Sequence, residues 1–261
     1  MSLLPASSIG DESTGFYNGV ATTSLRFDEG SNSNLTFTPS SAGSQKICTI
    51  SVWVKRSSAG SSGATEDTIF HAGTALGNRG HLRFYEDKID WEYYNGSWIF
   101  NLRTTGVFRD TSAWYHICGN LDTVAGTAKL WVNGVEVALS ESTIPSSSQD
   151  TTFGDDIEHQ IGFRKAGNAG YFHGYIADLH FIDGSDLDYS QFAEFKNGVL
   201  IPKKYTGSYG TNGFRLEFKQ TGTGTASSST IGADTSGNGN HFTSNNLSAH
   251  DVVPDCPENN F

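Results

Sequence analysis

The chain has little cysteine, little positive charge and no long apolar run among its 261 residues. Its three cysteines, Cys48, Cys118 and Cys256, are too few for a disulfide framework, and without a Cys-x-x-Cys spacing they do not predict structural zinc. No apolar stretch approaches the roughly 18 residues that a membrane-spanning helix needs. Residues 1–5 lack the basic and apolar regions of a secretory signal peptide, so if the protein acts outside cells we expect that it leaves by another route, such as inside a particle.

Positive charge is scarce, with 17 Lys and Arg against 28 Asp and Glu, which gives a formal net charge of −11. Phosphate binding needs clustered Lys and Arg side chains, and no such cluster occurs. The charge balance therefore excludes nucleic acid as the expected partner. The simplest consequence of the net negative charge is solubility, and a second is the attraction of divalent cations.

The chain is rich in the residues of short strands and tight turns: it has 30 Gly, and 12% of its residues are aromatic. Residues 24–28, 34–38 and 47–56 alternate in the manner of strands. In the last of these, Cys48, Ile50, Val52 and Val54 share one face. We expect an all-β protein with an irregular arm at 1–23, a sandwich at 24–219 and an extended C-terminal segment at 220–261.

Residues 88–103 predict a hairpin closed by Asn95-Gly96, because a two-residue turn of this type fixes the register. Tyr94 would then face Ser97, and Asp90 would face Asn101. One face of the hairpin is apolar and should be core, and it carries Ile89, Trp91, Tyr93, Trp98, Phe100 and Leu102. The other face should be wet or bind a ligand, and it carries Asp90, Glu92, Tyr94, Asn101 and Arg103.

A second hairpin is predicted at Asn133-Gly134, where both turn residues should have positive φ. In its register Val132 faces Val135 and Ala128 faces Leu139, on an apolar face. Trp131 lies on the opposite, polar face. There it could stack on a sugar ring or pack under a loop or another strand.

Residues 188–196 read as one short helix that Asp188 caps, with Gly198 and Pro202 as stop signals. Residues 213–219 are a further strand. The stretch from Asp234 to Asn240 is a polar turn.

The ordered set of motifs resembles the LamG-like, or concanavalin A-like lectin/glucanase, jelly roll over about residues 24–200. It consists of a strand ending in Phe27-Asp28, a strand containing Trp53, a Trp114-x-His116 strand, the Asn133-Gly134 hairpin, Ile161-Gly162, and Gly174-x-Ile176-x-Asp178. The resemblance implies a sandwich of two antiparallel sheets, a structural role for His116, and binding rather than an obvious enzyme.

Other segments resemble jelly-roll proteins of tailed, especially marine, bacteriophages. They begin at Ser24, Pro39, Trp53, Tyr209 and Asp234. This resemblance implies a capsid decoration or a fibre on the virion surface, assembled in the host cytoplasm. Its partners would be other virion proteins, further copies of itself and host surface glycans.

Catalysis has weak support in the sequence. Family-16 glucanases use a Glu-x-Asp-x-x-Glu strand in which the two Glu are nucleophile and general acid. The corresponding positions around Asp90 hold Lys88 and Tyr93, and no Gly-x-Ser-x-Gly elbow occurs. We therefore expect no enzyme, and glycoside hydrolysis is the least favoured of three hypotheses.

The candidate ligand-binding residues are those that the two registers turn outward: Trp131, Tyr94, Asp90, Glu92, Asn101 and Arg103. A plain solvated sheet face is the alternative. Calcium is the only cofactor that we expect, with oxygens from Asp234, Asn238 and Asn240, and the alternative there is an ordinary Asx turn. Residues 155–158 form a second, weaker cluster.

The leading hypothesis is a non-enzymatic virion protein with a lectin-like jelly roll that binds host glycans. A soluble carbohydrate-binding lectin module is the second hypothesis. The termini would serve attachment or oligomerisation, since polar chain can order on binding.

Overall fold

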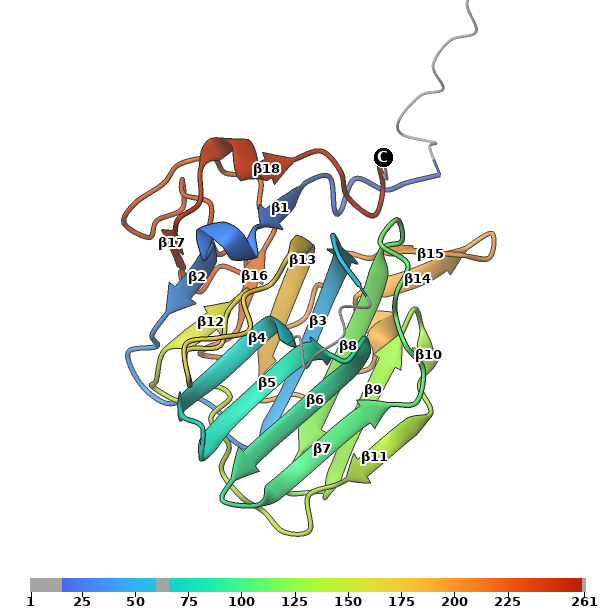
Figure 1. Cartoon of the computed structure of the whole chain (residues 1–261), viewed down its shortest axis with the longest axis vertical. Coiled ribbons are helices and arrows are strands. Elements are labelled where there is room, and N and C mark those ends of the chain that lie inside the picture. The colour runs from blue at the N-terminus through green and yellow to red at the C-terminus, as the bar shows by residue number, and fades with distance from the viewer. Residues whose placement is uncertain (1–15, 60–65, 260–261) are drawn as a thin grey trace, which may run out of the picture.

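A computed structural model describes residues 16–59 and 66–259. Residues 1–15 of the predicted arm and residues 60–65 lie outside these ranges. Two eight-stranded sheets, in which all neighbouring strands are antiparallel, form a sandwich, as the sequence predicted (Figure 1). Among the described residues, no helix has the length and apolar character that crossing a membrane would require.

The first sheet contains the residues of the Asn133-Gly134 hairpin. Its strands run in the order β10 (Val135–Glu136), β9 (Thr127–Val132), β8 (Tyr115–Asp122), β3 (Ile47–Arg56), β13 (Gly174–Asp183), β1 (Ser24–Phe27) and β18 (Val252–Val253), and β16 (Phe214–Leu216) also pairs with β13.

The second sheet contains the residues of the Asn95-Gly96 hairpin. Its strands run in the order β11 (Leu139–Thr143), β7 (Trp98–Thr104), β6 (Lys88–Asn95), β5 (Asn78–Tyr85), β4 (Glu66–Ala75), β12 (His159–Ile161), β2 (Asn34–Phe37) and β17 (Thr243–Asn245).

The core lies between the two sheets and follows the predicted alternation. Cys48, Ile50, Val52 and Val54 of β3 are at most 1% exposed. Trp91 of β6 reaches across the core, where its indole Nε1 donates to the carbonyl of Asn120 at 3.3 Å. Burying side chains of this size contributes about 1.5–3 kcal/mol each before entropy.

The β6–β7 hairpin is present, but its register differs from the prediction. Tyr94 pairs with Trp98 and Tyr93 with Phe100, so Ile99 is a bulge, and Asp90 pairs with Arg103 rather than Asn101. The offset at Asp90 is two residues, which leaves the two faces unchanged. The bulge moves Trp98 out of the core, and its side chain is 38% exposed. The other five predicted core residues are at most 2% exposed.

The β9–β10 turn confirms the predicted backbone, with φ of 50° at Asn133 and 77° at Gly134. Val132 pairs with Val135 as predicted. The predicted pairing of Ala128 with Leu139 is wrong, because the chain leaves the first sheet after β10 and Leu139 pairs with Thr104 of the second sheet.

The predicted helix at 188–196 is only a 3-10 turn, η3 (Tyr189–Gln191), which Asp188 caps by accepting from the backbone N–H of Ser190. The rest forms a separate hairpin of β14 (Ala193–Lys196) and β15 (Val199–Pro202). Two further 3-10 turns are η2 (Glu29–Ser31) and η4 (Ala249–Asp251).

The predicted C-terminal segment belongs to the sandwich. It supplies β17 and β18, which are edge strands of the two different sheets and lie on the same side of the fold (Figure 1), and Ile231 and Phe242 are fully buried in the main core. The carboxylate of Glu258 accepts hydrogen bonds at 2.8–3.1 Å from the backbone N–H groups of residues 19–21. The two ends of the described chain are thus joined.

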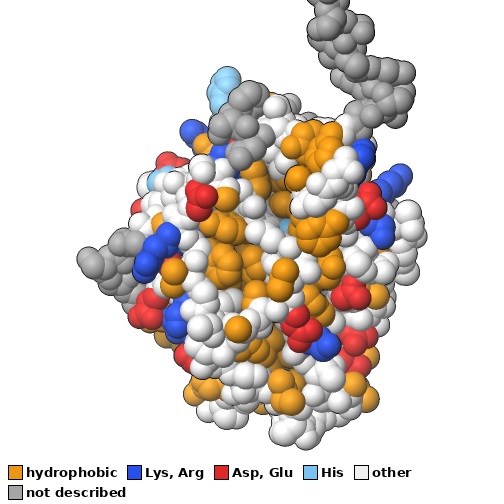
Figure 2. Space-filling model, turned by 90° about the vertical axis from the view of Figure 1, so that its right-hand side faces the viewer, with side chains coloured by type: hydrophobic (Ala, Val, Ile, Leu, Met, Phe, Trp, Pro, Cys, Tyr) orange, Lys and Arg blue, Asp and Glu red, His pale blue; other side chains and the backbone are white. Residues whose placement is uncertain are grey.

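One flank of the sandwich exposes apolar side chains. Figure 2 shows them gathered at the middle of the side on which β10, β14 and β15 lie, with charged groups mainly toward the margins. Val135, Phe195 and Val199 are 62%, 53% and 49% exposed.

Candidate functional site

The candidate residues of the second sheet share its outer face. Asp90, Glu92 and Tyr94 alternate along β6 with core-facing residues, and Asn101 and Arg103 alternate along β7. Direct cross-strand pairing joins Asp90 to Arg103 and Glu92 to Asn101. The structure therefore brings these five predicted residues together, because paired residues project on the same side of a sheet.

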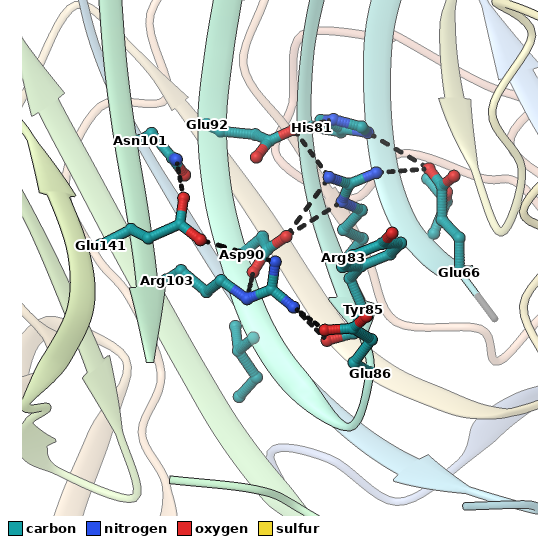
Figure 3. A network of polar contacts seen from close by, with 12 residues as sticks. Glu66, His81, Arg83, Tyr85, Glu86, Asp90, Glu92, Asn101, Arg103 and Glu141 are labelled. Carbon is teal, nitrogen blue, oxygen red and sulfur yellow. Dashed lines mark hydrogen bonds and ion pairs between the residues drawn. The ribbon is translucent and has the colours of Figure 1, made fainter. Parts of the chain in front are cut away.

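Neighbouring strands add charged residues that the sequence analysis missed. They are Glu66 on β4, His81 and Arg83 on β5, and Glu141 on β11, and Figure 3 shows them converging on the same face. The available signal was the alternation of Arg79, His81 and Arg83, which is that of a strand with one polar face.

Arg83 links three carboxylates (Figure 3). Its guanidinium nitrogens lie 3.2 Å from Glu66 Oε1, 3.3 Å from Asp90 Oδ2 and 3.0 Å from Glu92 Oε1. Glu92 also pairs with Nε2 of His81. The Arg83 side chain is 12% exposed, so these ion pairs are largely removed from water.

Arg103 makes a second set of contacts. Its nitrogens lie 3.5 Å from Asp90 Oδ1, 2.7 Å from Glu86 Oε2 and 3.7 Å from Glu141 Oε1. Glu141 in turn accepts a 2.7 Å hydrogen bond from the amide nitrogen of Asn101. The prediction of a solvated face is therefore wrong for Asp90, Glu92 and Asn101, which are 1%, 2% and 4% exposed.

Burial shapes the protonation of this network. It raises the pKa of Asp90 to about 7, against the opposing effect of Arg83, and it also raises the pKa of Glu92. Burial lowers the pKa of His81 well below its usual value, so its imidazole is neutral at pH 7. Burial would raise the pKa of Glu66 too, but Arg83 and His81 outweigh it and lower that pKa.

Two buried acceptors on this face are left without a hydrogen bond from any residue that the structure describes: Oδ1 of Asp90 and Oδ1 of Asn101. An unsatisfied buried acceptor costs about 1–3 kcal/mol. Such groups normally bind water or a ligand. Of the two, Oδ1 of Asp90 still lies 3.5 Å from Nε of Arg103, whereas Oδ1 of Asn101 has no such ion pair among the described residues.

An aromatic pair lies at one end of the face. The rings of Tyr94 and Trp98 meet edge to face, with centroids 5.0 Å apart and planes at 72°. The guanidinium of Arg79 lies 5.2 Å from the Tyr94 centroid and 5.9 Å from that of Trp98. Tyr94 and Glu92 are two residues apart on one face, a separation of about 7 Å, so the aromatic and charged groups are adjacent.

Trp131 lies on the predicted face of β9 but is only 7% exposed. It packs in a second apolar cluster with Cys118, Ile182, Phe192 and Tyr209. The prediction that Trp131 is available to a ligand is wrong, because the excursion that contains η3, β14 and β15 covers this part of the first sheet.

The proposed calcium ligands form a turn. The two carboxylate oxygens of Asp234 accept hydrogen bonds from three backbone N–H groups and from the hydroxyl of Ser236. The amide nitrogens of Asn238 and Asn240 donate to carbonyls within residues 210–213. Because the carboxylate oxygens are occupied and the amides present nitrogen, these residues do not fit a calcium site.

The second acidic cluster is also engaged: Asp155 accepts from Gln45, and Glu158 pairs with Lys165 at 2.9 Å. Within residues 16–59 and 66–259, no group of three His, Cys, Asp or Glu side chains could hold a metal ion.

Comparisons with known proteins address the family and the fold. The model of the Laminin_G_3 family, described as the concanavalin A-like lectin/glucanases superfamily, matches residues 29–185. A comparison with curated proteins gave no match.

Among solved structures, a protein from Bacteroides ovatus ATCC 8483 that has been assigned to carbohydrate binding is 17% identical, with a TM-score of 0.59. The alignment covers 86% of this chain and 58% of the Bacteroides protein, so the chain spans little more than half of that length.

Two other structures are more distant. A heptameric SAP-like pentraxin from Limulus polyphemus is 14% identical, with a TM-score of 0.48, over 66% of this chain and 80% of the pentraxin. Domains LG4–5 of the mouse laminin α1 chain are 13% identical, with a TM-score of 0.45, over 79% and 51%.

Proposed function

The chain belongs to the concanavalin A-like lectin/glucanases superfamily, and on this premise we propose that it is a non-catalytic protein that binds carbohydrate at the Tyr94–Trp98 end of the polar face. The observation that carries the proposal is the exposure of Trp98, whose ring lies against Tyr94 and near the guanidinium of Arg79 at one end of the polar face.

The aromatic pair suits a pyranose ring. A sugar has an apolar face of C–H groups and a rim of hydroxyls, so it needs an aromatic surface and adjacent polar groups. Trp98 is 38% exposed and supplies the first, while Arg79 lies next to Tyr94 and supplies the second. The ion pairs of Arg83 hold the polar groups in place, which reduces the side-chain entropy lost on binding.

Three features of β6 support binding without catalysis. The glucanase acid position is Tyr93, which points into the core and is 2% exposed. Lys88 occupies the nucleophile position. Asp90 and Glu92 are engaged by Arg83, so neither is a free acid or nucleophile.

We further propose that the protein is a surface part of a phage particle, a capsid decoration or a fibre. The segments that resemble phage jelly rolls support this location. Its direct test is mass spectrometry of purified particles that encode the chain, in which the protein should be present in stoichiometric amount. Absence from the particles would refute the location and leave the binding proposal standing.

A glycan array probed with the wild-type chain and with Trp98→Ala tests the binding proposal. We expect the variant to bind about 5- to 30-fold more weakly, because it loses an aromatic contact worth about 1–2 kcal/mol. Phe195→Ala is the matched control. Phe195 is an exposed aromatic of β14 that lies next to Gly134 in the hairpin of the first sheet, and so it is not part of the β6–β7 face. No binding by the folded wild-type chain, or equal binding by Trp98→Ala, would refute the proposed site.

A further inference from the structure

We propose that the ligand of this site is an acidic glycan whose carboxylate is bound by Arg79. This inference rests on the proposed function and specifies the chemical class of the sugar. It comes from the ion pairs of the polar face, in which the other arginines contact acidic side chains and Arg79 contacts none that the structure describes.

Three arginines on the face are paired with acids. Arg83 contacts Glu92 at 3.0 Å, Arg103 contacts Glu86 at 2.7 Å, and Arg164 contacts Glu66 Oε1 at 2.8 Å. These pairs neutralise the charges that the fold itself buries.

Arg79 forms no salt bridge with any residue that the structure describes. Its Nη1 donates to the carbonyl of Leu76, and its guanidinium lies against the rings of Tyr94 and Trp98. A guanidinium carries five N–H donors in a planar fork, so most of its donors stay available. The fork matches a carboxylate through two parallel hydrogen bonds.

The surroundings of Arg79 favour an added negative charge. Burial, followed by the nearby Arg83 and Arg164, lowers the pKa of Arg79, although Glu92 acts in the opposite direction. A ligand carboxylate would offset this cost. The aromatic pair beside Arg79 would hold the ring that bears the carboxylate, so one sugar residue could meet both groups.

The net charge of the whole chain limits where an acidic glycan can bind. At −11 the molecule repels acidic glycans at long range. Salt at physiological strength screens that repulsion beyond about 8 Å. Binding of an acidic sugar must therefore depend on a local cation, and Arg79 is the cation that adjoins the exposed aromatic.

The test has two stages. A glycan array with neutral, carboxylated and sulfated glycans identifies the class. An oligogalacturonate and its methyl ester, which differ in the charge of the carboxyl group, then serve as matched probes in titration calorimetry. We expect the strongest array signals from carboxylated glycans, and weaker binding of the ester than of the acid by about 10- to 100-fold.

Variants assign the effect to Arg79. We expect Arg79→Gln to reduce acid binding by about 10- to 100-fold and to leave ester binding nearly unchanged, whereas Trp98→Ala weakens both. Lys129→Gln is the control for the change in net charge, because Lys129 is half exposed on β9 of the first sheet and pairs with Glu136. Arg79→Lys should recover only part of the acid binding, since an ammonium group lacks the planar fork.

The outcomes separate the two proposals. Three results would overturn the carboxylate inference and leave carbohydrate binding intact. The first is an array signal only from neutral or only from sulfated glycans. The others are equal affinity for the acid and the ester, and equal losses of affinity in Arg79→Gln and Lys129→Gln. No signal from any glycan would remove the proposed function itself, and the inference with it.

Discussion

Replacing Asp90 with Asn should stabilise the protein at alkaline pH. Burial raises the pKa of this carboxyl from 3.8 to about 7. Because the folded-state pKa lies above the unfolded value, the folded protein binds the proton more tightly, and stability is lost as the pH rises from about 4 through 7. A difference of about three pH units between the two values corresponds to about 4 kcal/mol when the carboxyl is fully ionised.

The Asn side chain carries no charge at any pH, so it avoids the cost of burying an ionised carboxylate. We expect Asp90→Asn to raise the free energy of unfolding by about 2–4 kcal/mol near pH 8.5, and by less than half as much near pH 5. Urea unfolding of both proteins at the two pH values measures this directly.

Asp178→Asn serves as a control, because the change in stability that we expect from it has the opposite sign. Burial would raise its pKa, but His180 and Arg215 outweigh burial and lower it. Ionised Asp178 therefore stabilises the fold above its unfolded pKa, and Asp178→Asn should destabilise the protein near pH 8.5. An Asp90→Asn protein that is no more stable than wild type near pH 8.5, or whose advantage does not change with pH, would refute this account of the network.

Three further changes test other parts of the structure. Glu258→Gln should lower the unfolding free energy by about 1–2 kcal/mol in denaturant titration, because the three backbone N–H groups of residues 19–21 lose a charged acceptor; an unchanged midpoint would show that this contact does not hold the ends together. Trp131→Ala should cost about 3–5 kcal/mol, as for a buried aromatic, and a thermal midpoint close to wild type would contradict the burial of that ring. A chelator such as EDTA should leave the thermal midpoint of the wild-type chain unchanged, since the oxygens of Asp234 are already occupied, and a clear drop would show that a metal does bind.

The sandwich could be predicted from the sequence because strand alternation and turn type, which are local features, determine it. Alternation placed Ile50 and Val52 in the core, and the Asn133-Gly134 turn fixed the pairing of Val132 with Val135. The faces of β6 and β7 were also correct apart from Trp98, although the register was not. A shift of two residues preserves the faces, so the prediction of which side chains gather on the polar face was robust to that error.

The wrong pairing of Leu139 and the open position of Trp131 share a cause. In both, a segment distant in sequence determines how the residue pairs or is covered. The pairing predicted for Leu139 failed because the chain crosses to the second sheet, where Thr104 is its partner. The sequence left Trp131 between stacking on a sugar and packing under a loop or strand, because its own hairpin gives no sign of the residues near Phe192 and Tyr209 that cover it. Alternation assigns a side chain to a face, but it does not tell whether another part of the chain covers that face.

The bulge at Ile99 adds Trp98 to the candidate site on the second sheet. With strict two-residue turn geometry, Trp98 would belong to the core, and the two predicted hairpins would offer Tyr94 and Trp131 as the aromatics for a sugar. One extra residue in β7 reverses this, because it turns Trp98 outward beside Tyr94 and Arg79. Deleting Ile99 should leave Tyr94 opposite Trp98 and Tyr93 opposite Phe100 in a regular ladder, so Trp98 stays on the outer face and glycan binding is retained. Loss of glycan binding in a folded deletion variant would show that the site needs the bulge itself as well as the exposed Trp98.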